Sequence, residues 1–254
     1  MSADEVAIMI RIATWKRRGS RASIVHAMPS LPAPWLSIAA VGASQPVIVE
    51  MVADVVCPYC HIGLKRLERA IAATSHAANI HVRYTPFILR RHLPKEGVPK
   101  REVFREQFGS YDKAERVISQ VVETASEDGL VFNLTTQMAG NSEDAHRLMM
   151  WAGPKAVTLF EDLAKAYNQE QLWVGDHDVL VRSASRSNLD REAAGKMLAD
   201  PSAYQDELEA GLRRARSLGV TSVPAFFVNG VLLGTGALSE GALRSVLEHT
   251  CAAE

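Results

Sequence analysis

The stretch of sequence that decides the fold is VVCPYCH, residues 55–61, which contains two of the three cysteines in the chain. The spacing Cys57-x-x-Cys60 is compatible with three kinds of site. Because a histidine follows directly, the stretch matches the attachment motif of c-type haem. Together with His76 and His81 it fits the loose end of zinc-finger spacing. Between a strand and a helix, it would be typical of a thiol–disulfide redox centre.

The residues around this motif predict a βαβ unit. Residues 46–56 (PVIVEMVADVV) are rich in β-branched side chains and predict a buried strand. Residues 58–74 predict a helix, opened by Pro58, whose missing N–H would have no partner in the first turn anyway. Residues 79–89 predict a second strand, parallel to the first if the helix crosses over between them.

The rest of the chain predicts a helical block and then a return to strands. Apolar residues keep helical spacing through 104–128, 142–152 and 157–167, and Asp200-Pro201 is the expected start of a further helix. Residues 91–204 are too many for a loop, so we expect a helical insertion between two halves of one sheet domain.

The C-terminal part predicts the second half of that domain. Asn229-Gly230 is a favoured hairpin turn between two short apolar strands, and Ser239 is expected to cap a closing helix. We therefore expect an α/β fold in which residues 46–90 and 205–250 form the sheet domain.

Composition limits the class of protein. The 254 residues are 47% hydrophobic and 22% charged, with a formal net charge of −1, which suits one or two folded domains and does not suggest a nucleic-acid partner. No apolar run reaches the roughly 18 residues that a membrane helix needs. Three cysteines are too few for a disulfide scaffold, so the folded part is compatible with a reducing compartment.

The N-terminal residues 1–45 have a different composition. Residues 6–49 contain five basic residues and no acidic residue, which resembles an organellar transit peptide. A disordered tail or a misassigned start codon is the alternative. We leave this segment out of the fold and expect a cytoplasmic or organellar protein.

The predicted elements separate the three kinds of site. If the helix over 58–74 is continuous, His76 lies about 16 residues beyond Cys60, or roughly 24 Å along the axis. Zinc ligands lie within about 2.3 Å of the metal, so a zinc site is disfavoured. Haem is not excluded by geometry, but the βαβ setting favours a redox motif. His61 is then expected to be a solvated residue of the first turn.

The redox interpretation provides a mechanism. Cys57 is expected at the start of the helix, where unpaired N–H groups and the helix dipole favour a thiolate. Cys60 lies about one turn later on the same face and is expected to be the more buried thiol, which attacks a mixed disulfide at Cys57. Far downstream, Val223-Pro224 stands just before a predicted strand, in a tight turn of the kind where cis proline is found.

Two long segments carry a family resemblance. DVVCPYCHIGLKRLERAI (54–71) resembles the active-site strand and helix of DsbA-like thioredoxin-fold oxidoreductases. GVTSVPAFFVNGVLLGTGALSEGAL (219–243) resembles their cis-proline loop, terminal hairpin and last helix. FILRRHLPKEG, NSEDAHRLMMWAG and LFEDLAKAYNQEQLWVGDHDVLV extend the similarity toward the FrnE branch, over about residues 47–247.

The resemblance implies a thioredoxin fold with a large inserted α-helical domain, and disulfide exchange with proteins or small thiols. It implies that Cys57 is the nucleophile and Cys60 the resolving thiol. It also implies that Pro224 is a cis residue packed against the disulfide and that the Val223 backbone pairs with an extended substrate strand. Pro58 and Tyr59 are then expected to modulate the redox potential. It implies no bound cofactor, glutathione as a candidate co-substrate, and a monomer or homodimer.

Some residues are given structural roles. Cys251, near the C-terminus, has no second cysteine beside it in sequence and is expected to be a thiol in the tail. Asp144, His146 and Arg147 are expected on the solvated face of a capped helix, and the alternative is that they face the active-site cleft. Residues 213–216 (RRAR) are expected to be an exposed helix face, and residues 149–151 (MMW) to lie in the core. A protonated His61 could also stabilise the Cys57 thiolate.

Two other functions stay open. Glutathione transferases of the kappa class and hydroxychromene-carboxylate isomerases share the fold implied by the resemblance, but they usually carry serine at the position of Cys57 and lack the cysteine pair. A chaperone-like binding module would bind unfolded chains between the sheet domain and the helical block without using Cys57.

Overall fold

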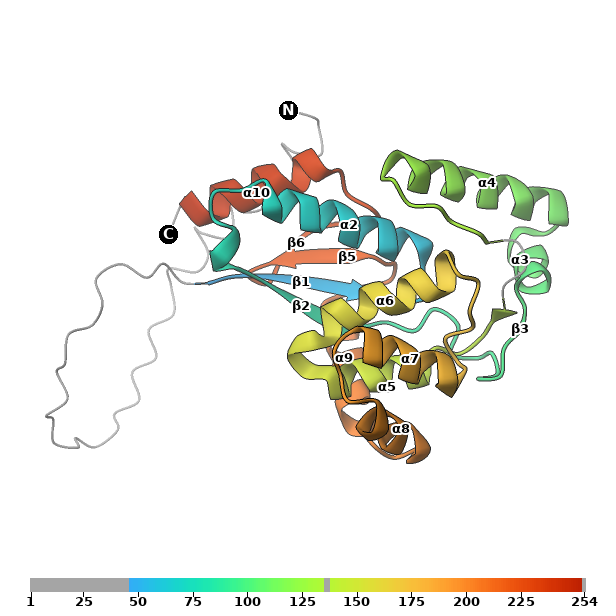
Figure 1. Ribbon diagram of the computed structural model, residues 1–254. Helices are drawn as coiled ribbons and strands as arrows, with labels where there is room; N and C mark the ends of the chain where they lie inside the picture. Colours follow the sequence, from blue (N-terminus) through green and yellow to red (C-terminus); the bar gives the residue numbers. More distant parts are fainter. Residues whose placement is uncertain (1–45, 135–137, 253–254) are drawn as a thin grey trace, which may run out of the picture.

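The computed structural model describes residues 46–134 and 138–252, so the predicted targeting segment, residues 1–45, lies outside the described residues. A four-stranded sheet forms the centre, with strand order β2-β1-β5-β6 (Figure 1). The strands are β1 (Val47–Ala53), β2 (Ile80–Pro86), β5 (Ala225–Val228) and β6 (Val231–Thr235). β1 runs parallel to β2 and antiparallel to β5, and β5 and β6 form the predicted hairpin.

The predicted βαβ unit is confirmed. α2 (Pro58–Ala72) connects β1 to β2, and a short 3-10 turn, η1 (Ala77–Asn79), precedes β2. β1 ends three residues earlier than residues 46–56 predicted, because the chain turns at Asp54. The carbonyl of Asp54 accepts the N–H of Cys57 at 3.1 Å, and its carboxylate accepts the N–H of Val56 at 3.3 Å.

Helices make up most of the chain between β2 and β5, together with a short ribbon, β3 (Val98–Pro99) and β4 (Met138–Ala139). The helices are α3 (Lys100–Phe108), α4 (Tyr111–Glu127), α5 (Glu143–Ala152), α6 (Ala156–Asn168), α7 (His177–Arg186), α8 (Arg191–Ala199) and α9 (Gln205–Ser217), with a 3-10 turn η2 (Gly153–Lys155). α10 (Glu240–Ala252) closes the described chain, and Ser239 Oγ accepts the N–H of Ala242 at 3.2 Å, which is the predicted cap. Within the described ranges, no helix has the length and apolar character needed to span a membrane.

The helical block differs in detail from the prediction. The helix expected over 104–128 is two helices, because Gly109 adopts a φ of 85° and Ser110 then caps α4. α7 and α8 were not predicted. The helix expected from Asp200-Pro201 begins only at Gln205, since Tyr204 takes a left-handed φ of 59° that no sequence pattern signals.

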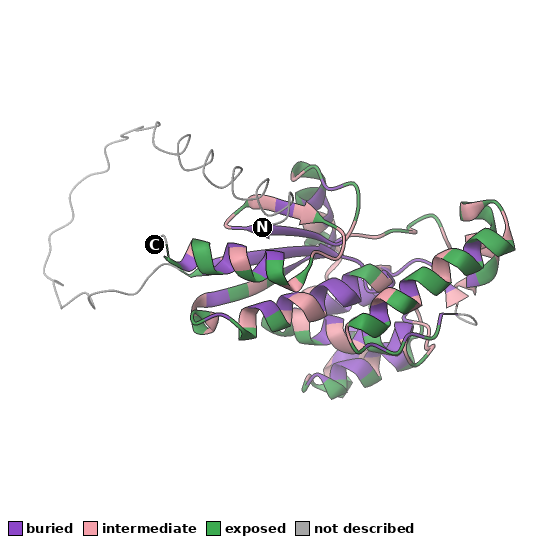
Figure 2. Ribbon diagram, turned by 90° about the horizontal axis from the view of Figure 1, so that it is seen from above, coloured by how far each residue is buried: buried purple, intermediate pink, exposed green. Residues whose placement is uncertain are grey.

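One hydrophobic core joins the sheet to the inserted helices. α2 and α10 lie against one face of the sheet and α9 against the other (Figure 1), and the two central strands, β1 and β5, are buried along nearly their whole length (Figure 2). Val49 and Met51 of β1 belong to the same buried cluster as Leu148 of α5 and Leu163 of α6. The helical insertion is therefore packed on the sheet domain rather than tethered to it.

A buried carboxylate fixes α9 to the sheet. Glu50 of β1 is 1% exposed and accepts hydrogen bonds from Arg214 of α9, from Arg83 at 2.8 Å and from Thr85 at 2.6 Å. Burial by itself would raise the pKa of Glu50, but these hydrogen bonds outweigh it and lower the pKa to about 2. The expectation for residues 213–216 is met, since their three arginines are exposed.

Of the two remaining structural expectations, the one for residues 149–151 is met and the one for Cys251 is not. Met149 is fully buried in the core, while Met150 and Trp151 are partly buried and pack against it. The expectation that Cys251 is a thiol of the C-terminal tail is wrong. Cys251 lies in α10 and is 7% exposed within the main core, because α10 continues to Ala252 and keeps that side chain on its inner face.

Gly211 allows α9 to approach β2 closely. A Cβ at this position would lie 2.5 Å from Cγ and 2.6 Å from Cδ of Pro86. We predict that Gly211→Ala lowers the free energy of unfolding, measured by urea denaturation, by about 1–3 kcal/mol, because the rigid Pro86 ring cannot move without moving β2.

The matched control is Gly195→Ala in α8, where the nearest atom to a new Cβ would be Cγ2 of Val181 at 4.0 Å. This variant should be more stable than the parent by up to about 1 kcal/mol, since alanine favours the helix. Similar changes in stability for the two variants would contradict this account of the packing.

Candidate active site

The first turn of α2 presents two cysteines in different environments. Cys57 is the N-cap residue, with φ −90° and ψ 113°, and its carbonyl accepts the N–H groups of Cys60 at 3.1 Å and His61 at 3.4 Å. Both side chains are thiols. Cys57 is 6% exposed and Cys60 is fully buried. Only Cys57 can therefore meet another molecule without a change in the fold.

The environment of Cys60 favours its neutral form. Burial raises the pKa of this thiol well above its ordinary value, and the hydrogen bond and charge of Cys57 raise it further. The charge of Asp54 acts in the same direction, while a hydrogen bond with the Asp54 backbone opposes it. Cys60 is thus expected to hold its proton in the reduced protein at neutral pH.

The loop before β5 lies against Cys57. The thiol of Cys57 is 3.8 Å from the carbonyl oxygen of Val223, and the Val223–Pro224 peptide bond is cis. Gly63 of α2 packs on the same loop, because a Cβ there would lie 3.1 Å from Cγ of Pro224 and 3.0 Å from Cζ of Phe226. Cys57 and Val223, which are 166 positions apart in the sequence, therefore meet in the structure.

The other two predicted site residues lie in the same turn. Pro58 is the first residue of α2 and is partly buried, and Tyr59 is 38% exposed. Leu89, 40% exposed, is a second exposed apolar side chain connected to this region, since its N–H donates to Asp54 at 2.8 Å. A pocket of about 400 Å³ opens beside Leu89 and is lined in addition by Arg90, His92, Leu93, Val103, Glu106 and Gln107.

A buried polar network behind the cysteines was not predicted. The carboxylate of Asp54 is fully buried and accepts hydrogen bonds from Ser142 Oγ at 2.9 Å and His146 Nε2 at 3.1 Å, in addition to the two backbone N–H groups. The other ring nitrogen of His146 is hydrogen-bonded to the hydroxyl of Tyr84. The hydroxyl of Tyr84 also donates to the carbonyl of Ala53 at 3.2 Å, so this network reaches the end of β1.

The charges of this network act on Cys60. Burial would raise the pKa of Asp54, but the hydrogen bonds from His146, Leu89 and Ser142 outweigh it and hold the pKa below its ordinary value. Burial raises the pKa of Tyr84 well above its ordinary value, with added contributions from the charges of Asp54 and Cys60. One feature of the sequence could have indicated this site: Asp54 is an acidic residue inside the apolar run that precedes Cys57, and a buried carboxylate needs partners.

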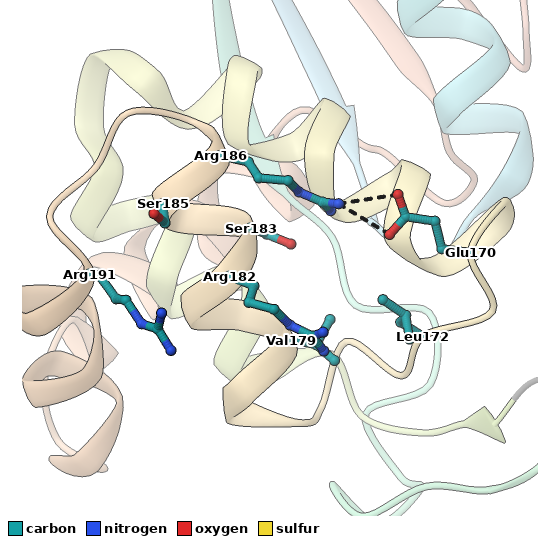
Figure 3. A pocket seen from close by; sticks show the side chains of 8 residues that line it. All are labelled: Glu170, Leu172, Val179, Arg182, Ser183, Ser185, Arg186 and Arg191. Atoms are coloured by element: carbon teal, nitrogen blue, oxygen red, sulfur yellow. Dashed lines mark hydrogen bonds and ion pairs between the residues drawn. The ribbon is translucent and has the colours of Figure 1, made fainter.

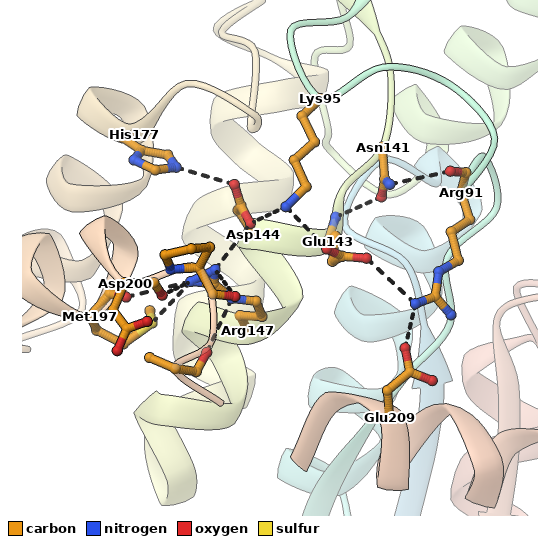
Figure 4. A network of polar contacts seen from close by, with 12 residues as sticks. Arg91, Lys95, Asn141, Glu143, Asp144, Arg147, His177, Met197, Asp200 and Glu209 are labelled. Carbon is orange, nitrogen blue, oxygen red and sulfur yellow. Dashed lines mark hydrogen bonds and ion pairs between the residues drawn. The ribbon is translucent and has the colours of Figure 1, made fainter. Parts of the chain in front are cut away.

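The expectation of a solvated face at the start of α5 is wrong. Asp144 is 8%, His146 0% and Arg147 1% exposed. The carboxylate of Asp144 binds Lys95 at 2.8 Å and His177 at 3.1 Å, which joins three segments of the insertion (Figure 4). Arg147 donates to the backbone carbonyls of Met197, Asp200, Pro201 and Ala203. Of these three residues, His146 is the one that contacts the carboxylate behind the cysteines.

The expectation for His61 is also wrong. Its ring is 1% exposed and stacks on Phe132 with centroids 5.4 Å apart, and Nδ1 has no hydrogen-bond partner among the described residues. Burial, with a smaller effect of the Lys65 charge, lowers the pKa of His61 to about 4. His61 is therefore neutral at pH 7, and the hypothesis that its positive charge stabilises the Cys57 thiolate is wrong at that pH.

A second pocket lies on α7, away from the cysteines. It has a volume of about 240 Å³ and is lined by Arg182, Arg186 and Arg191 among others (Figure 3). Arg186 is paired with Glu170 at 3.1 Å. None of the lining residues belongs to the predicted site. Among the described residues, no cluster of three or more histidine, cysteine, aspartate or glutamate side chains could hold a metal ion.

Known proteins share the fold of this chain. Residues 48–248 match the family model of the DSBA-like thioredoxin domain. A probable DsbA oxidoreductase from Streptomyces coelicolor is similar in structure, with a TM-score of 0.75 and 28% sequence identity over 82% of this chain and 91% of that chain. No curated protein matches the sequence.

Two more distant structures share the fold. The cytosolic disulfide reductase DsbM from Pseudomonas aeruginosa has a TM-score of 0.58 and 15% identity, covering 82% of this chain and 100% of that chain. A 2-hydroxychromene-2-carboxylate isomerase has a TM-score of 0.60 and 15% identity, covering 81% of this chain and 97% of that chain. These similarities confirm the predicted fold class, a thioredoxin fold with inserted helices.

The burial of His61 predicts a pH dependence of stability. Below pH 6.5 the unfolded chain takes up a proton on this residue, whereas the folded protein does so only near pH 4. The free energy of unfolding should therefore fall as the pH falls from 6.5 to 4, by about 3 kcal/mol from this residue. His61→Phe keeps an aromatic ring against Phe132 but cannot take up a proton. In this variant, the decrease of about 3 kcal/mol in the free energy of unfolding that comes from His61 should be absent.

Urea denaturation at several pH values tests this prediction. His249→Phe on the exposed side of α10 is the matched control and should keep the pH dependence of the parent. An unchanged pH dependence in His61→Phe would mean that another group is responsible.

Proposed function

The chain belongs to the DSBA-like thioredoxin domain family, and from this membership we propose that it is a thiol–disulfide oxidoreductase whose redox centre is Cys57-Pro58-Tyr59-Cys60. The observation that carries the proposal is the difference between the two thiols. Cys57 reaches the surface at a helix N-terminus, beside the cis-proline loop, whereas Cys60 is buried directly behind it. This arrangement suits one attacking thiol and one resolving thiol.

Reduction of a substrate disulfide then takes two steps. The Cys57 thiolate attacks one substrate sulfur, forms a mixed disulfide and releases the other sulfur as a thiolate. Cys60 next attacks Sγ of Cys57, which forms the Cys57–Cys60 disulfide and releases the second substrate thiolate. Two electrons pass from the cysteine pair to the substrate. The reverse sequence oxidises a dithiol substrate.

The buried network supports a role for Asp54 in the second step. Cys60 must lose its proton as it attacks, and its environment favours the protonated form. Asp54 carries a negative charge that acts on Cys60 and is hydrogen-bonded to His146 and Ser142. We propose that this carboxylate accepts the proton of Cys60 and that the hydrogen bonds hold it in place.

The substrate is proposed to lie along the cis-proline loop. The carbonyl of Val223 faces the Cys57 thiol, so an extended peptide could pair with the Val223 backbone while Pro224 shapes the turn. Tyr59 and Leu89 offer apolar contacts. Glutathione is the small-thiol candidate, and a DsbM structure with GSH shares the fold at a TM-score of 0.54 and 15% identity.

The finer assignments remain predictions. The family match does not name the FrnE branch. The glutathione transferase or isomerase alternative is favoured by the fold of the hydroxychromene-carboxylate isomerase alone. The intact cysteine pair supports disulfide exchange over that alternative, because a transferase or isomerase has no use for a resolving thiol.

Equilibration with mixtures of reduced and oxidised glutathione, followed by alkylation and mass measurement, tests the proposed function. We expect Cys57 and Cys60 to convert together in one reversible two-electron step. Cys60→Ser should accumulate a mixed disulfide with glutathione at Cys57, because the resolving thiol is missing. Cys57→Ser should show neither the two-electron oxidation nor the mixed disulfide with glutathione.

Cys251→Ser is the control and should behave as the parent protein, since that side chain is buried in the main core. If Cys57 and Cys60 are oxidised independently of each other across the glutathione mixtures, disulfide exchange by the pair is excluded. Binding of unfolded chains that persists in Cys57→Ser would favour the chaperone-like alternative instead.

A second prediction concerns Asp54. Asp54→Asn keeps the shape of the side chain but cannot accept a proton, so the mixed disulfide should be resolved roughly 100-fold more slowly. Rapid acid quenching and mass measurement give the lifetime of the adduct. Ser142→Ala, which removes one hydrogen bond but keeps the carboxylate, should change the lifetime far less. An unchanged lifetime in Asp54→Asn would exclude the carboxylate as proton acceptor.

A further inference from the structure

The pocket beside Leu89 lies next to the redox centre. Its volume is about 400 Å³, and its walls come from the connection after β2, with Leu89 and Arg90, and from α3, with Gln107. In Figure 1, α3 lies at the end of the sheet where α2 begins. The N–H of Leu89 donates to the carboxylate of Asp54 at 2.8 Å, and the carbonyl of Asp54 accepts the N–H of Cys57 at 3.1 Å. A single residue therefore connects the edge of the pocket to the start of α2.

Two contacts hold Arg90 in the wall of this pocket. Its guanidinium lies 5.5 Å from the centroid of the Phe104 ring, and its Nη2 donates to Oε1 of Gln107 at 3.3 Å. Both partners belong to α3, so the side chain reaches from the connection to the helix. An aromatic face and a side-chain amide orient a guanidinium, but neither supplies a negative charge.

The charge of Arg90 has no carboxylate partner within residues 46–134 and 138–252. Its neighbour Arg91 differs, because that guanidinium is paired with Glu143 at 3.5 Å. Glu106 also lines the pocket, but its carboxylate lies 3.6 Å from the guanidinium of Arg105. Arg90 is thus a partly buried, permanently charged group that an anion in the pocket could neutralise.

A second basic group lies beside the same aromatic ring. Nζ of Lys100, the first residue of α3, is 5.2 Å from the centroid of the Phe104 ring. Burial lowers the pKa of Lys100 to about 7, and the positive charge of Arg90 contributes to this shift. The two basic groups therefore oppose each other's charge, and a bound anion would offset that repulsion.

The rest of the lining limits the kind of anion. Leu89, Leu93 and Val103 are apolar, so the pocket suits an organic group as well as a charge. A carboxylate is the natural partner of a guanidinium, because it accepts two parallel N–H donors. A molecule with a sulfur at Cys57 and a carboxylate a few bonds away would reach both places, and small peptide thiols and disulfides have this form.

We propose that this pocket is a substrate subsite, in which Arg90 binds a carboxylate of a small peptide thiol or disulfide of the glutathione class while the sulfur of that molecule lies at Cys57. This inference rests on the proposed function and specifies its substrate class. Arg90 then determines which substrates bind well, and the cysteine pair carries out the exchange whichever substrate is bound.

Replacement of Arg90 by glutamine, which removes the charge and keeps a polar side chain, tests the inference. Reduced protein is mixed with oxidised glutathione, which has carboxylates, or with bis(2-hydroxyethyl) disulfide, which has none. Each reaction converts the protein dithiol and the added disulfide into the protein disulfide and two small thiols, and alkylation with mass measurement follows it. The ratio of the rate constant with oxidised glutathione to that with the uncharged disulfide should fall about tenfold in Arg90→Gln, as expected for the loss of one charge-assisted contact in a partly exposed site.

Arg116→Gln is the matched control, because Arg116 is exposed on α4 and does not line the pocket. It removes the same charge and should keep the ratio of the parent protein. Arg90→Lys keeps the charge but loses the two parallel donors, so its ratio should lie between those of Arg90→Gln and the parent. An unchanged ratio in Arg90→Gln would overturn the inference and leave the proposed function standing. If the reduced parent protein reacts with neither disulfide, the proposed function fails.

A second measurement needs no substitution at Arg90. S-methylglutathione cannot exchange disulfides, and its addition to the reduced parent protein should shift the NMR signal of the Arg90 side-chain Nε–H. Its diethyl ester, in which both carboxylates are blocked, should need about a tenfold higher concentration for the same shift. An Arg90 signal that does not respond, or that responds equally to both compounds, would also overturn the inference.

Discussion

The burial of one carboxylate constrains the rest of this structure. A carboxylate without water around it needs several hydrogen-bond donors, and Asp54 takes them from its own turn, from the connection after β2 and from α5. The sheet domain and the helical insertion must therefore dock in one arrangement for these donors to converge. That arrangement also puts a negative charge and a network of exchangeable protons directly behind Cys60.

The two cysteines obtain their different properties from different sources. The start of α2 fixes the position of Cys57 through local chain geometry, since it is the N-cap of a helix that opens with Pro58. The burial of Cys60 comes from packing, because the helix must lie close to the loop of Pro224, which the absence of a side chain at Gly63 allows. One thiol at the protein surface and one fully buried thiol thus follow from one helix docked against one loop.

The helical insertion contributes to the chemistry as well as to the shape. His146 of α5 and Ser142, the residue before that helix, both hydrogen-bond to Asp54. The family match covers the sheet domain and the insertion together, and structures with different named activities share both parts. The shared fold therefore does not by itself identify the reaction, which has to be argued from the residues of the site.

The sequence by itself determined the features that depend on neighbours along the chain. The βαβ unit, the hairpin at Asn229-Gly230, the position of Cys57 at a helix start and the cap at Ser239 all follow from local periodicity and turn preferences. Tertiary structure alone decided that His61 and Cys251 are buried and that His146 joins Asp54. Burial and long-range hydrogen bonds depend on which surfaces meet when distant segments pack, and a single sequence records the polarity of a side chain but not the partner that it will face.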